Sequence, residues 1–457
     1  MAEYRPTIGL EIHAELNTRT KMFCACLNDA DEKRPNVNVC PVCMAHPGTL
    51  PVINKEAVKH VLRMGLALNS TLADYTEFDR KSYFYPDIPK GYQLSQYAYP
   101  LVRGGVLRNI EITRIHLEED TARSQHEGDT SFIDYNRAGV PLMELVTEPV
   151  IHTAEDAGNF ARELQLLLRY LGAGEANMEK GEMRVEANIS VSKDDTLGTK
   201  VEVKNLNSFR SVERAIAYEI ARHIEVLEKG GTLVQETRGW NENTQSTFSQ
   251  RKKESSHDYR YFPDPDLPKL RLSEISEFSA DTLRASLPEI PSEKRAKYIK
   301  MGLKQEDADM FTSQPQAGWL FDTAVKHLPE GDPRIALTAN YVANNLAGKG
   351  ENIEPAELAV LVEFRIQNKI SSAGARDALN EVIANGGDLK LIVMKYLQHN
   401  DVSGIVQKVM EENPNVVADY KAGKAASLQF LVGQGMKESK GSANPTALAE
   451  EFKKALQ

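Results

Sequence analysis

Four cysteines near the N-terminus form the pattern in this chain with the clearest chemistry. They stand as Cys24-Ala25-Cys26 and Cys40-Pro41-Val42-Cys43, and the 457-residue sequence contains no other cysteine. Paired thiolates suit a tetrahedral zinc ion, because zinc accepts soft ligands held by short turns. We therefore predict that Cys24, Cys26, Cys40 and Cys43 bind one zinc ion.

A second group of polar residues lies on segments that alternate as strands do. The segment from Thr7 to Leu16 alternates with a period of two, which puts Glu11 and His13 on one face. Other members lie on or beside further predicted strands: His116, Glu118, Glu119, Glu186 and Glu202. Carboxylates with an imidazole on neighbouring strands could hold Mg²⁺ together with water and phosphate oxygens.

The alternative for each of these residues is an ordinary solvated strand face, where most charged side chains lie. The run Glu118-Glu119-Asp120 argues for more than that. Three acids in a row repel one another unless a cation or a basic partner is present.

The elements that must position these residues form a β-rich first part of the chain. Alternating segments at 7–16, 110–118, 183–191 and 200–204 carry apolar residues on one face and charges on the other, which predicts an antiparallel sheet. The alternation slips by one residue between 112 and 115, which indicates a β-bulge. Capping residues and terminal glycines predict two helices, one from Thr153 to Gly172 and one from about Phe209 to Lys229.

The residue pattern of the sequence changes after Tyr261. Five prolines punctuate the stretch to residue 291, and the chain is then helical in pattern. A further shift comes near Asn413-Pro414. From Lys421 to Gln457 six lysines stand against three glutamates, a local charge of +3 in a chain whose net charge is −10.

Two segments interleave aromatic and basic residues. The first, Phe78–Asp87, contains Lys81, Tyr83 and Tyr85, and the second, His257–Asp264, contains Arg260. Such segments suit single-stranded nucleic acid, since bases stack on the rings and phosphates pair with the cations. An aromatic loop packed on the core is the alternative.

Several stretches resemble, in the same order along the whole chain, the GatB family, whose members are the second of the three component chains of the tRNA-dependent amidotransferases. The matching stretches are Ile8–His13, Pro47–Val52, Phe78–Asp87, His116–Asp120, Asp134–Arg137, Ala187–Ser190, Lys204–Phe209, Asp258–Pro263, Leu431–Gln434 and Gly441–Pro445. The resemblance implies an α+β fold. Residues 1–291 would form a cradle domain around an antiparallel sheet, 292–410 an all-α helical domain, and 411–457 a small helical tail that resembles the YqeY family and binds tRNA.

The resemblance also implies a function. The family uses ATP to phosphorylate the side-chain carboxylate of Glu-tRNA(Gln) or Asp-tRNA(Asn), and then amidates it, as a ligase with glutamine as the amido donor. The chain has neither a P-loop nor a G-x-S-x-G elbow. Ammonia would come from an amidase partner, the A subunit, and a small C subunit would complete a heterotrimer.

The resemblance assigns roles to these residues. The magnesium ligands would be Glu11, His13, Glu118, Glu119, Glu186 and Glu202. In addition, we expect Lys81 and Lys204 to offset negative charge on the phosphates or on the acyl-tRNA end, and Tyr83, Tyr85 and Arg260 to bind the tRNA end. Glu186 stands where the family often has Asp, and Asp120-Thr121-Ala122-Arg123 replaces its Asp-Ala-Gly-Lys. Because some family members lack the four cysteines, the zinc is expected to be structural.

Two alternative functions conflict with parts of the sequence. A zinc-containing tRNA-binding module without chemistry would have no reason to collect carboxylates facing a polyanion. A free-standing metal-dependent hydrolase would leave the helical and basic C-terminal part unexplained. The acidic net charge argues against a general polyanion binder. No apolar run approaches a membrane span and the start shows no signal peptide, so we expect a cytoplasmic protein with reduced cysteines.

Overall fold

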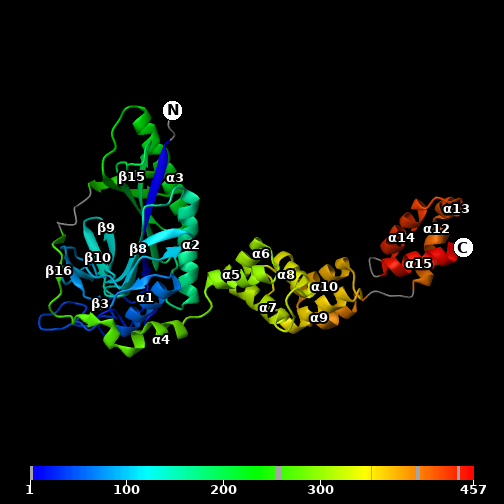
Figure 1. The fold of residues 1–457 in the computed structure, drawn as a ribbon, viewed down its shortest axis with the longest axis horizontal. Coiled ribbons are helices and arrows are strands. Elements are labelled where there is room, and N and C mark those ends of the chain that lie inside the picture. The colour runs from blue at the N-terminus through cyan, green and yellow to red at the C-terminus, as the bar shows by residue number, and fades with distance from the viewer. Residues whose placement is uncertain (1–3, 253–258, 351, 398–401, 440–442, 457) are drawn as a thin grey trace. The chain divides into compact units, whose positions relative to one another are not determined.

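The computed structural model describes residues 4–252, 259–350, 352–397, 402–439 and 443–456. The chain divides into two compact units, residues 1–290 and 291–457. The first combines a large sheet with helices, and the described part of the second is helical (Figure 1).

The first unit is built on a thirteen-stranded sheet. The strands of this unit are β1 Arg5–Glu15, β2 Thr71–Leu72, β3 Tyr75–Thr76, β4 Asp79–Ser82, β5 Tyr92–Ser95, β6 Val102–Arg103, β7 Val106–Leu107, β8 Ile110–Glu119, β9 Arg123–Glu127, β10 Thr130–Asp134, β11 Pro141–Thr147, β12 Met183–Ser192, β13 Val201–Leu206, β14 Glu236–Asn241, β15 Ser246–Lys252, β16 Phe262–Pro263 and β17 Leu270–Arg271. Ten of them follow the order β15-β14-β13-β12-β1-β11-β8-β5-β4-β16, and β6 and β7 pair with β8 while β2 pairs with β6. The pairs β9–β10 and β3–β17 form separate two-stranded sheets.

The expected antiparallel sheet is correct except at one junction. β13 and β14 pair in parallel, with Glu202 opposite Thr237. A parallel pair needs a long crossover connection, usually a helix. The helix that was predicted from Phe209 onward provides it here, because it lies between these two strands in the sequence.

Helices cover one face of the sheet. Those of the first unit are α1 Lys55–Ala67, α2 Ala154–Tyr170, α3 Phe209–Glu228, α4 Ala280–Ala285 and the short 3₁₀ segments η2 Leu272–Glu274 and η3 Ser276–Phe278. The apolar residues of β1, Ile8, Leu10 and Ile12, are fully buried in the core that these helices share with the sheet. Figure 1 shows α2 running beside β1. The alternate residues of β1 therefore face the other way, toward the face without these helices.

Local sequence signals were reliable guides to these elements. The backbone N–H of Asp156 donates to Thr153 Oγ1 at 3.0 Å, as a helix N-cap requires, and Gly172 ends the helix region with φ +64°. The predicted bulge is also confirmed. Arg114 lies opposite Val146 but Ile112 lies opposite Thr147, so Thr113 is the extra residue of β8.

The helices of the second unit gather around two separate hydrophobic clusters. They are α5 Pro291–Lys300, α6 Gln305–Ser313, α7 Pro315–Val325, α8 Pro333–Asn344, α9 Pro355–Ile366, α10 Ser372–Asn385, α11 Leu389–Met394, α12 Ser403–Glu412, α13 Pro414–Lys421, α14 Ala426–Glu438 and α15 Pro445–Leu456. One cluster runs from Tyr298 to Val393 and the other from Val402 to Leu456. Because α12 packs on α14 and α15, the second cluster begins before residue 411. The predicted three-domain division remains a prediction. Within the described residues no helix combines the length and hydropathy needed to cross a membrane.

A buried ionic network ties α3 to the β14–β15 hairpin. Glu219 of α3 is fully buried, and its carboxylate lies 2.7 Å from Arg222 Nη2, 3.3 Å from Arg238 Nε and 3.2 Å from His223 Nε2. The Thr247 hydroxyl also donates to it. Burial raises the pKa of Glu219, but the nearby His223, Arg222 and Thr247 side chains outweigh burial and lower it to about 2. The network therefore depends on an ionised Glu219.

We predict that Glu219→Gln lowers the free energy of unfolding of the first unit by about 3 kcal/mol at pH 7, because Arg222 loses its buried counter-charge and Arg238 keeps only its pair with Glu236. The folded-state pKa lies below its ordinary value of 4.5, so the carboxylate stabilises the wild type above about pH 5. That contribution fades as the pH falls toward 2, whereas the variant never has it. Urea unfolding followed by Trp240 fluorescence in a Trp319→Phe background measures both effects.

Glu225→Gln is the matched control, since Glu225 lies on the same helix and its pair with Lys229 is exposed. It should unfold like the wild type. Equal stabilities of Glu219→Gln and wild type at pH 7 would contradict the role given to the network.

Candidate active site

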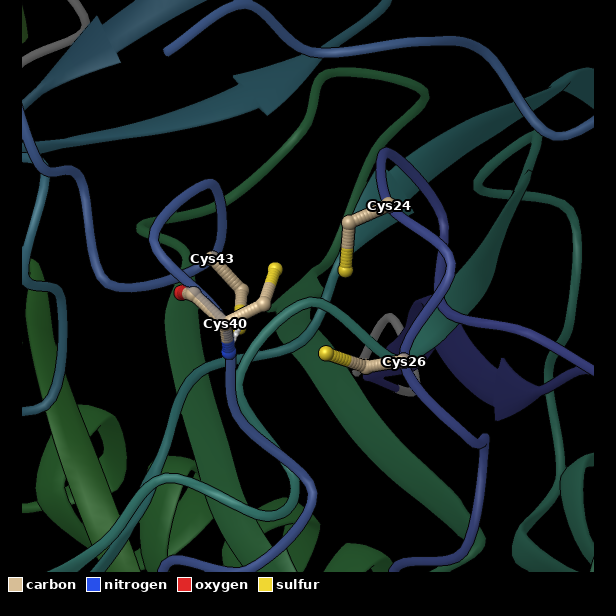
Figure 2. A group of neighbouring side chains, drawn as sticks. All are labelled: Cys24, Cys26, Cys40 and Cys43. Carbon is tan, nitrogen blue, oxygen red and sulfur yellow. Dashed lines mark hydrogen bonds between the residues drawn. The ribbon is translucent and has the colours of Figure 1, made fainter.

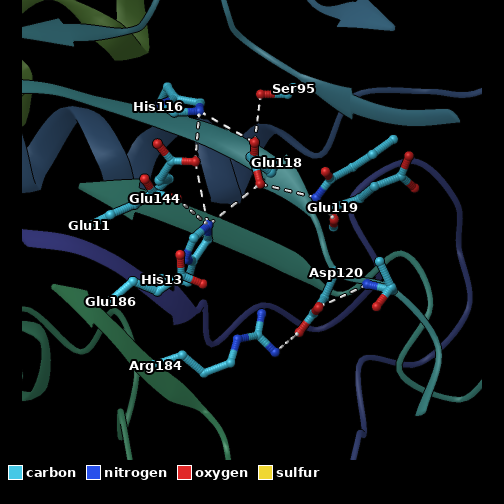
Figure 3. A network of polar contacts seen from close by, with 12 residues as sticks. Glu11, His13, Ser95, His116, Glu118, Glu119, Asp120, Glu144, Arg184 and Glu186 are labelled. Carbon is cyan, nitrogen blue, oxygen red and sulfur yellow. Dashed lines mark hydrogen bonds and ion pairs between the residues drawn. The ribbon is translucent and has the colours of Figure 1, made fainter. Parts of the chain in front are cut away.

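The predicted carboxylates and imidazoles meet in a row across β1, β11 and β8. The strand register places His13 opposite Glu144, and Glu144 opposite His116. Glu11 precedes His13 by two residues and Glu118 follows His116 by two residues, so both side chains lie on the same face of the sheet as the histidines. Figure 3 shows these side chains pointing toward one another on the face away from the core helices.

Four of these groups form a ring in which imidazoles and carboxylates alternate. His13 Nε2 lies 3.4 Å from Glu144 Oε2 and 3.9 Å from Glu118 Oε2. His116 Nε2 lies 3.5 Å from Glu118 Oε1 and 3.6 Å from Glu144 Oε2. Glu11 Oε1 adds a further carboxylate 4.0 Å from His13 Nε2. Each imidazole can thus be held by two acids at once.

Neighbouring strands hold the two buried carboxylates of the ring in place. Gln93 Nε2 donates to Glu118 Oε2 at 3.0 Å, and Ser95 Oγ donates to Glu118 Oε1 at 2.7 Å. Arg114 Nη2 donates to Glu144 Oε1 at 3.3 Å. The carboxylates are therefore preorganised, as side chains that bind a metal or a reacting group must be.

The pKa values of the ring residues and of the adjacent Glu11 are shifted in different directions. Burial raises the pKa of Glu11, with the Glu144 and Glu186 charges adding to it, to about 7. Burial lowers the pKa of His13, but its hydrogen bond with Glu144 and the nearby carboxylates raise it to about 9. Burial raises the pKa of Glu144, but His116 and His13 outweigh burial and hold it below its usual range. The site therefore contains tightly held ion pairs next to an acid that is not fully balanced.

A second acidic group continues the row on the other side of β1. Glu186 of β12 lies opposite Glu11, and β13 bulges at this point, where Asn205 has φ +64°. Lys204 Nζ lies 2.7 Å from Glu186 Oε2 and 3.8 Å from Glu202 Oε2. The Lys204 ammonium group thus lies between two carboxylates, at a place where they stabilise positive charge.

Three overlapping groups of this row could each hold a divalent cation. They are Glu11–His13–Glu144, His116–Glu118–Glu144 and Glu11–Glu186–Glu202, and within each group one donor atom per residue lies within 4.8 Å of the others. The third offers carboxylate oxygen alone, which hard cations such as Mg²⁺ prefer.

A cavity of about 220 Å³ opens over this row. Tyr97 and Tyr261 form one wall, with ring centroids 4.1 Å apart and planes at 15°. Lys81 Nζ lies 5.0 Å from the centroid of the Tyr259 ring, in the same wall. Burial lowers the pKa of Lys81, but the Glu118 carboxylate leads the charges that raise it above its ordinary value. The cavity thus combines a cation with aromatic faces beside the carboxylates.

The structure brings together most, but not all, of the predicted site residues. Glu11, His13, Glu118, Glu186 and Glu202 share the row, and Lys81 and Lys204 line the same cavity.

Glu119 lies apart from this row, because successive residues of a strand face opposite sides. Its carboxylate pairs with Lys90 and accepts from the backbone N–H of Leu94 at 3.0 Å. Tyr83 packs near Tyr259, whereas Tyr85 is 60 % exposed and Arg260 is exposed with φ +46°. Residues 257, 258, 441 and 442 of the aromatic-basic and C-terminal motifs lie outside the described part of the chain.

Glu144 is the main residue that sequence reasoning missed. It stands alone among apolar residues in the strand Pro141–Thr147, and it is buried. A single acid in a buried apolar strand is unusual, because burying a charge is costly without a partner. A lone carboxylate in an apolar strand was therefore the feature of the sequence that could have pointed to Glu144.

The four cysteines also come together, in loops that follow β1. Their sulfur atoms all lie within 4.8 Å of one another and point toward a common centre (Figure 2). Four sulfurs at about 2.3 Å from one zinc ion would be about 3.8 Å apart, which this cluster permits. A hydrogen bond with the Cys24 side chain lowers the pKa of the Cys43 thiol to about 5. Burial opposes this shift, and the positive charge of Lys21 adds to it. The cluster is therefore compatible with zinc.

Comparison with known proteins agrees with this geometry. Residues 6–276 match the model of the GatB/GatE catalytic domain, and residues 320–456 match that of the GatB domain. Several relatives are described as the B subunit of an aspartyl/glutamyl-tRNA(Asn/Gln) amidotransferase. The one from Caldanaerobacter subterraneus subsp. tengcongensis is 43% identical over 97% of both chains, and those from Dehalococcoides mccartyi and Persephonella marina are 41% identical over 100% of both. The catalytic-domain match contains the whole carboxylate row and its cavity. The chain therefore belongs to the GatB family of aspartyl/glutamyl-tRNA amidotransferase components.

Proposed function

We propose that this chain activates and amidates an amino acid attached to tRNA. ATP phosphorylates the side-chain carboxylate of Glu-tRNA(Gln), Asp-tRNA(Asn) or both, and ammonia then displaces the phosphate to give the amide. The observation that carries the proposal is the row of carboxylates and histidines beside Lys81 and Lys204, inside the cavity of a catalytic-domain match. A tRNA-binding module without chemistry has no use for carboxylates that face a polyanion.

The chemistry explains why such a site is needed. A carboxylate is a poor electrophile because oxide is a poor leaving group, whereas an acyl phosphate releases phosphate when ammonia attacks its carbonyl carbon. Bringing a triphosphate to a second anion requires positive charge. Lys81 and Lys204 supply part of it, and Mg²⁺ bound by residues of the row would neutralise more.

The row keeps an excess of negative charge that a bound metal ion would offset. Five carboxylates, those of Glu11, Glu118, Glu144, Glu186 and Glu202, face the side-chain cations of Lys81, Arg114 and Lys204 and the His13 imidazole, whose raised pKa favours its cationic form. The position of Lys204 between two carboxylates marks a place where positive charge is stabilised. We propose Glu11, His13, Glu118 and Glu144 as ligands, with Glu186 and Glu202 completing the second group, and not Glu119.

We further propose how the substrate and the nitrogen reach this cavity. The aromatic wall, with Tyr83, Tyr85 and Arg260 nearby, would bind the acylated end of the tRNA. Ammonia would come from an amidase subunit in a heterotrimer with a small third subunit, with glutamine as the amido donor. Cysteines that bind zinc rather than form disulfides would suit a reducing compartment such as the cytoplasm.

Glu118→Gln tests the function. It keeps the shape of the side chain but removes a charge that the Gln93 and Ser95 donors hold in place. We expect transfer of the γ-phosphate from labelled ATP to the misacylated tRNA to slow about a hundredfold or more, because the metal-binding carboxylate stabilises the transition state by several kcal/mol.

Two controls make that assay specific. The glutaminase reaction of the amidase partner, measured in the same complex, should change much less, since its chemistry lies in another chain. Glu111→Gln, an exposed residue of the same strand β8, should leave phosphoryl transfer unchanged. Transfer by Glu118→Gln at the wild-type rate would show that the row is only a charged surface.

We propose that the cysteine cluster holds one structural zinc ion. Cys40→Ser should reduce the zinc content of the purified chain from one ion per molecule toward none, because a hydroxyl is a poor zinc ligand. Limited proteolysis should then cut the 24–43 loop first, while helices α5–α11, which have their own core, stay resistant. A Cys40→Ser protein that retains a full equivalent of zinc by mass spectrometry would refute the assignment.

We propose that the C-terminal helices bind tRNA. A deletion of these helices tests the proposal. It should remove residues 398–457, because α12 belongs to their hydrophobic core and a deletion from Asn413 onward would leave α12 behind. The dissociation constant for tRNA should rise and depend less steeply on salt, since fewer counterions are released. Replacing the exposed Lys453 and Lys454 of α15 with Gln should give a smaller change in the same direction. An unchanged dissociation constant and salt slope for the deletion would contradict this role.

A further inference from the structure

The β14–β15 hairpin directs one hydroxyl group at the carboxylate row. Thr237 of β14 lies opposite Glu202 in the parallel pair, and Thr237 Oγ1 donates to Glu202 Oε2 at 2.7 Å. Thr237 is 2 % exposed and Glu202 is 7 % exposed, and both line the cavity over the row. The bond is therefore shielded from bulk water, where a hydroxyl would exchange it easily for a solvent contact.

The next residue of β14 anchors the strand from its other side. Arg238 Nε lies 3.3 Å from Glu219 Oε1 on α3, and Arg238 Nη2 donates to the backbone oxygen of Thr247 at 3.0 Å. The register between β14 and β15 shifts at this point, between Thr237 and Arg238. Because successive strand residues face opposite sides, Arg238 fixes β14 to α3 while Thr237 faces the cavity. The hydroxyl thus stands on a rigid support.

The Thr237 bond acts on a carboxylate that has a competing partner. Lys204 Nζ lies 3.8 Å from the same oxygen, Glu202 Oε2, and 2.7 Å from Glu186. If the Thr237 hydroxyl were absent, the ammonium group would draw Glu202 toward itself. Glu202 would then be less well placed to act together with Glu11 and Glu186, the other members of its group.

We infer that Thr237 is a positioning residue, which orients Glu202 for the cation that the Glu11–Glu186–Glu202 group would bind. The inference rests on the proposed function, since it assigns a role within the same site. Thr237 would act through Glu202 rather than on the reacting groups. Its effect is on cation affinity, as for other residues that hydrogen-bond a metal-ligating carboxylate.

The test compares two buried threonines of one hairpin. Thr237→Val keeps the shape and removes the hydroxyl. Thr247→Val does the same to the threonine that donates to Glu219, on the α3 side of the hairpin. Mn²⁺ serves as the probe, and its binding to the full-length chain is measured by electron paramagnetic resonance after the cysteine cluster has been loaded with zinc.

We expect Thr237→Val to weaken Mn²⁺ binding about tenfold. Thr237→Ser, which keeps the hydroxyl, should restore it, and Thr247→Val should bind Mn²⁺ like the wild type despite being less stable. In the complete complex, Thr237→Val should need about tenfold more Mg²⁺ for half-maximal phosphoryl transfer, with the rate at saturating Mg²⁺ close to that of wild type.

Glu202→Gln separates failure of this inference from failure of the site. If Glu202→Gln weakens Mn²⁺ binding and Thr237→Val does not, the inference about Thr237 is wrong and the site stands. If neither variant differs from wild type in Mn²⁺ affinity, Glu202 holds no cation. The inference about Thr237 and the assignment of Glu202 as a ligand are then both wrong. Should Thr237→Val fail to fold, the comparison of Thr237→Ser with Thr237→Ala replaces it, and equal affinities of those two overturn the inference.

Discussion

The structure of the first unit is organised around the balance of negative charge on one face of its central sheet. Burying carboxylates is costly unless each is paired or hydrogen-bonded. The ring of His13, Glu144, His116 and Glu118 meets part of that cost by alternating acids with imidazoles. The rest of the acidity requires basic side chains and, in the proposed function, a metal. The helices on the opposite face make this possible, because they provide the hydrophobic core that keeps the charged face rigid.

The predictable part of this arrangement is the part that depends on local pattern. Period-two alternation placed Glu11 and His13 on one face, and a phase slip located the bulge at Thr113. The same rule could have excluded Glu119, since it cannot share a face with Glu118 in an unbroken strand. Glu144 could not be found in this way. It joins the site because β11 pairs between β1 and β8, and pairing partners and register are set by tertiary structure rather than by the sequence of any one strand.

One departure from the family pattern can be explained by the same charge balance. Glu186 stands where the resemblance implies Asp, and its carboxylate reaches Lys204 beside the bulge of β13. Asp120, which this chain has in common with the family's Asp-Ala-Gly-Lys, is buried, with Arg184 Nη1 at 3.0 Å and Arg137 Nε at 3.7 Å. Asp120 is thus balanced by arginines at the margin of the row, where it can support the strand end without adding uncompensated charge.

The central claim is that the carboxylate row binds a divalent cation at the place where phosphoryl transfer occurs. Anomalous X-ray scattering at the manganese edge, from crystals of the complete complex soaked in Mn²⁺ with a non-hydrolysable ATP analogue, tests this directly. The account predicts an anomalous peak within coordinating distance of Glu11, His13, Glu118 or Glu144, with phosphate oxygens bound to the same ion. A peak found elsewhere on the first unit, with the phosphates beside it and the row without manganese, would contradict the account.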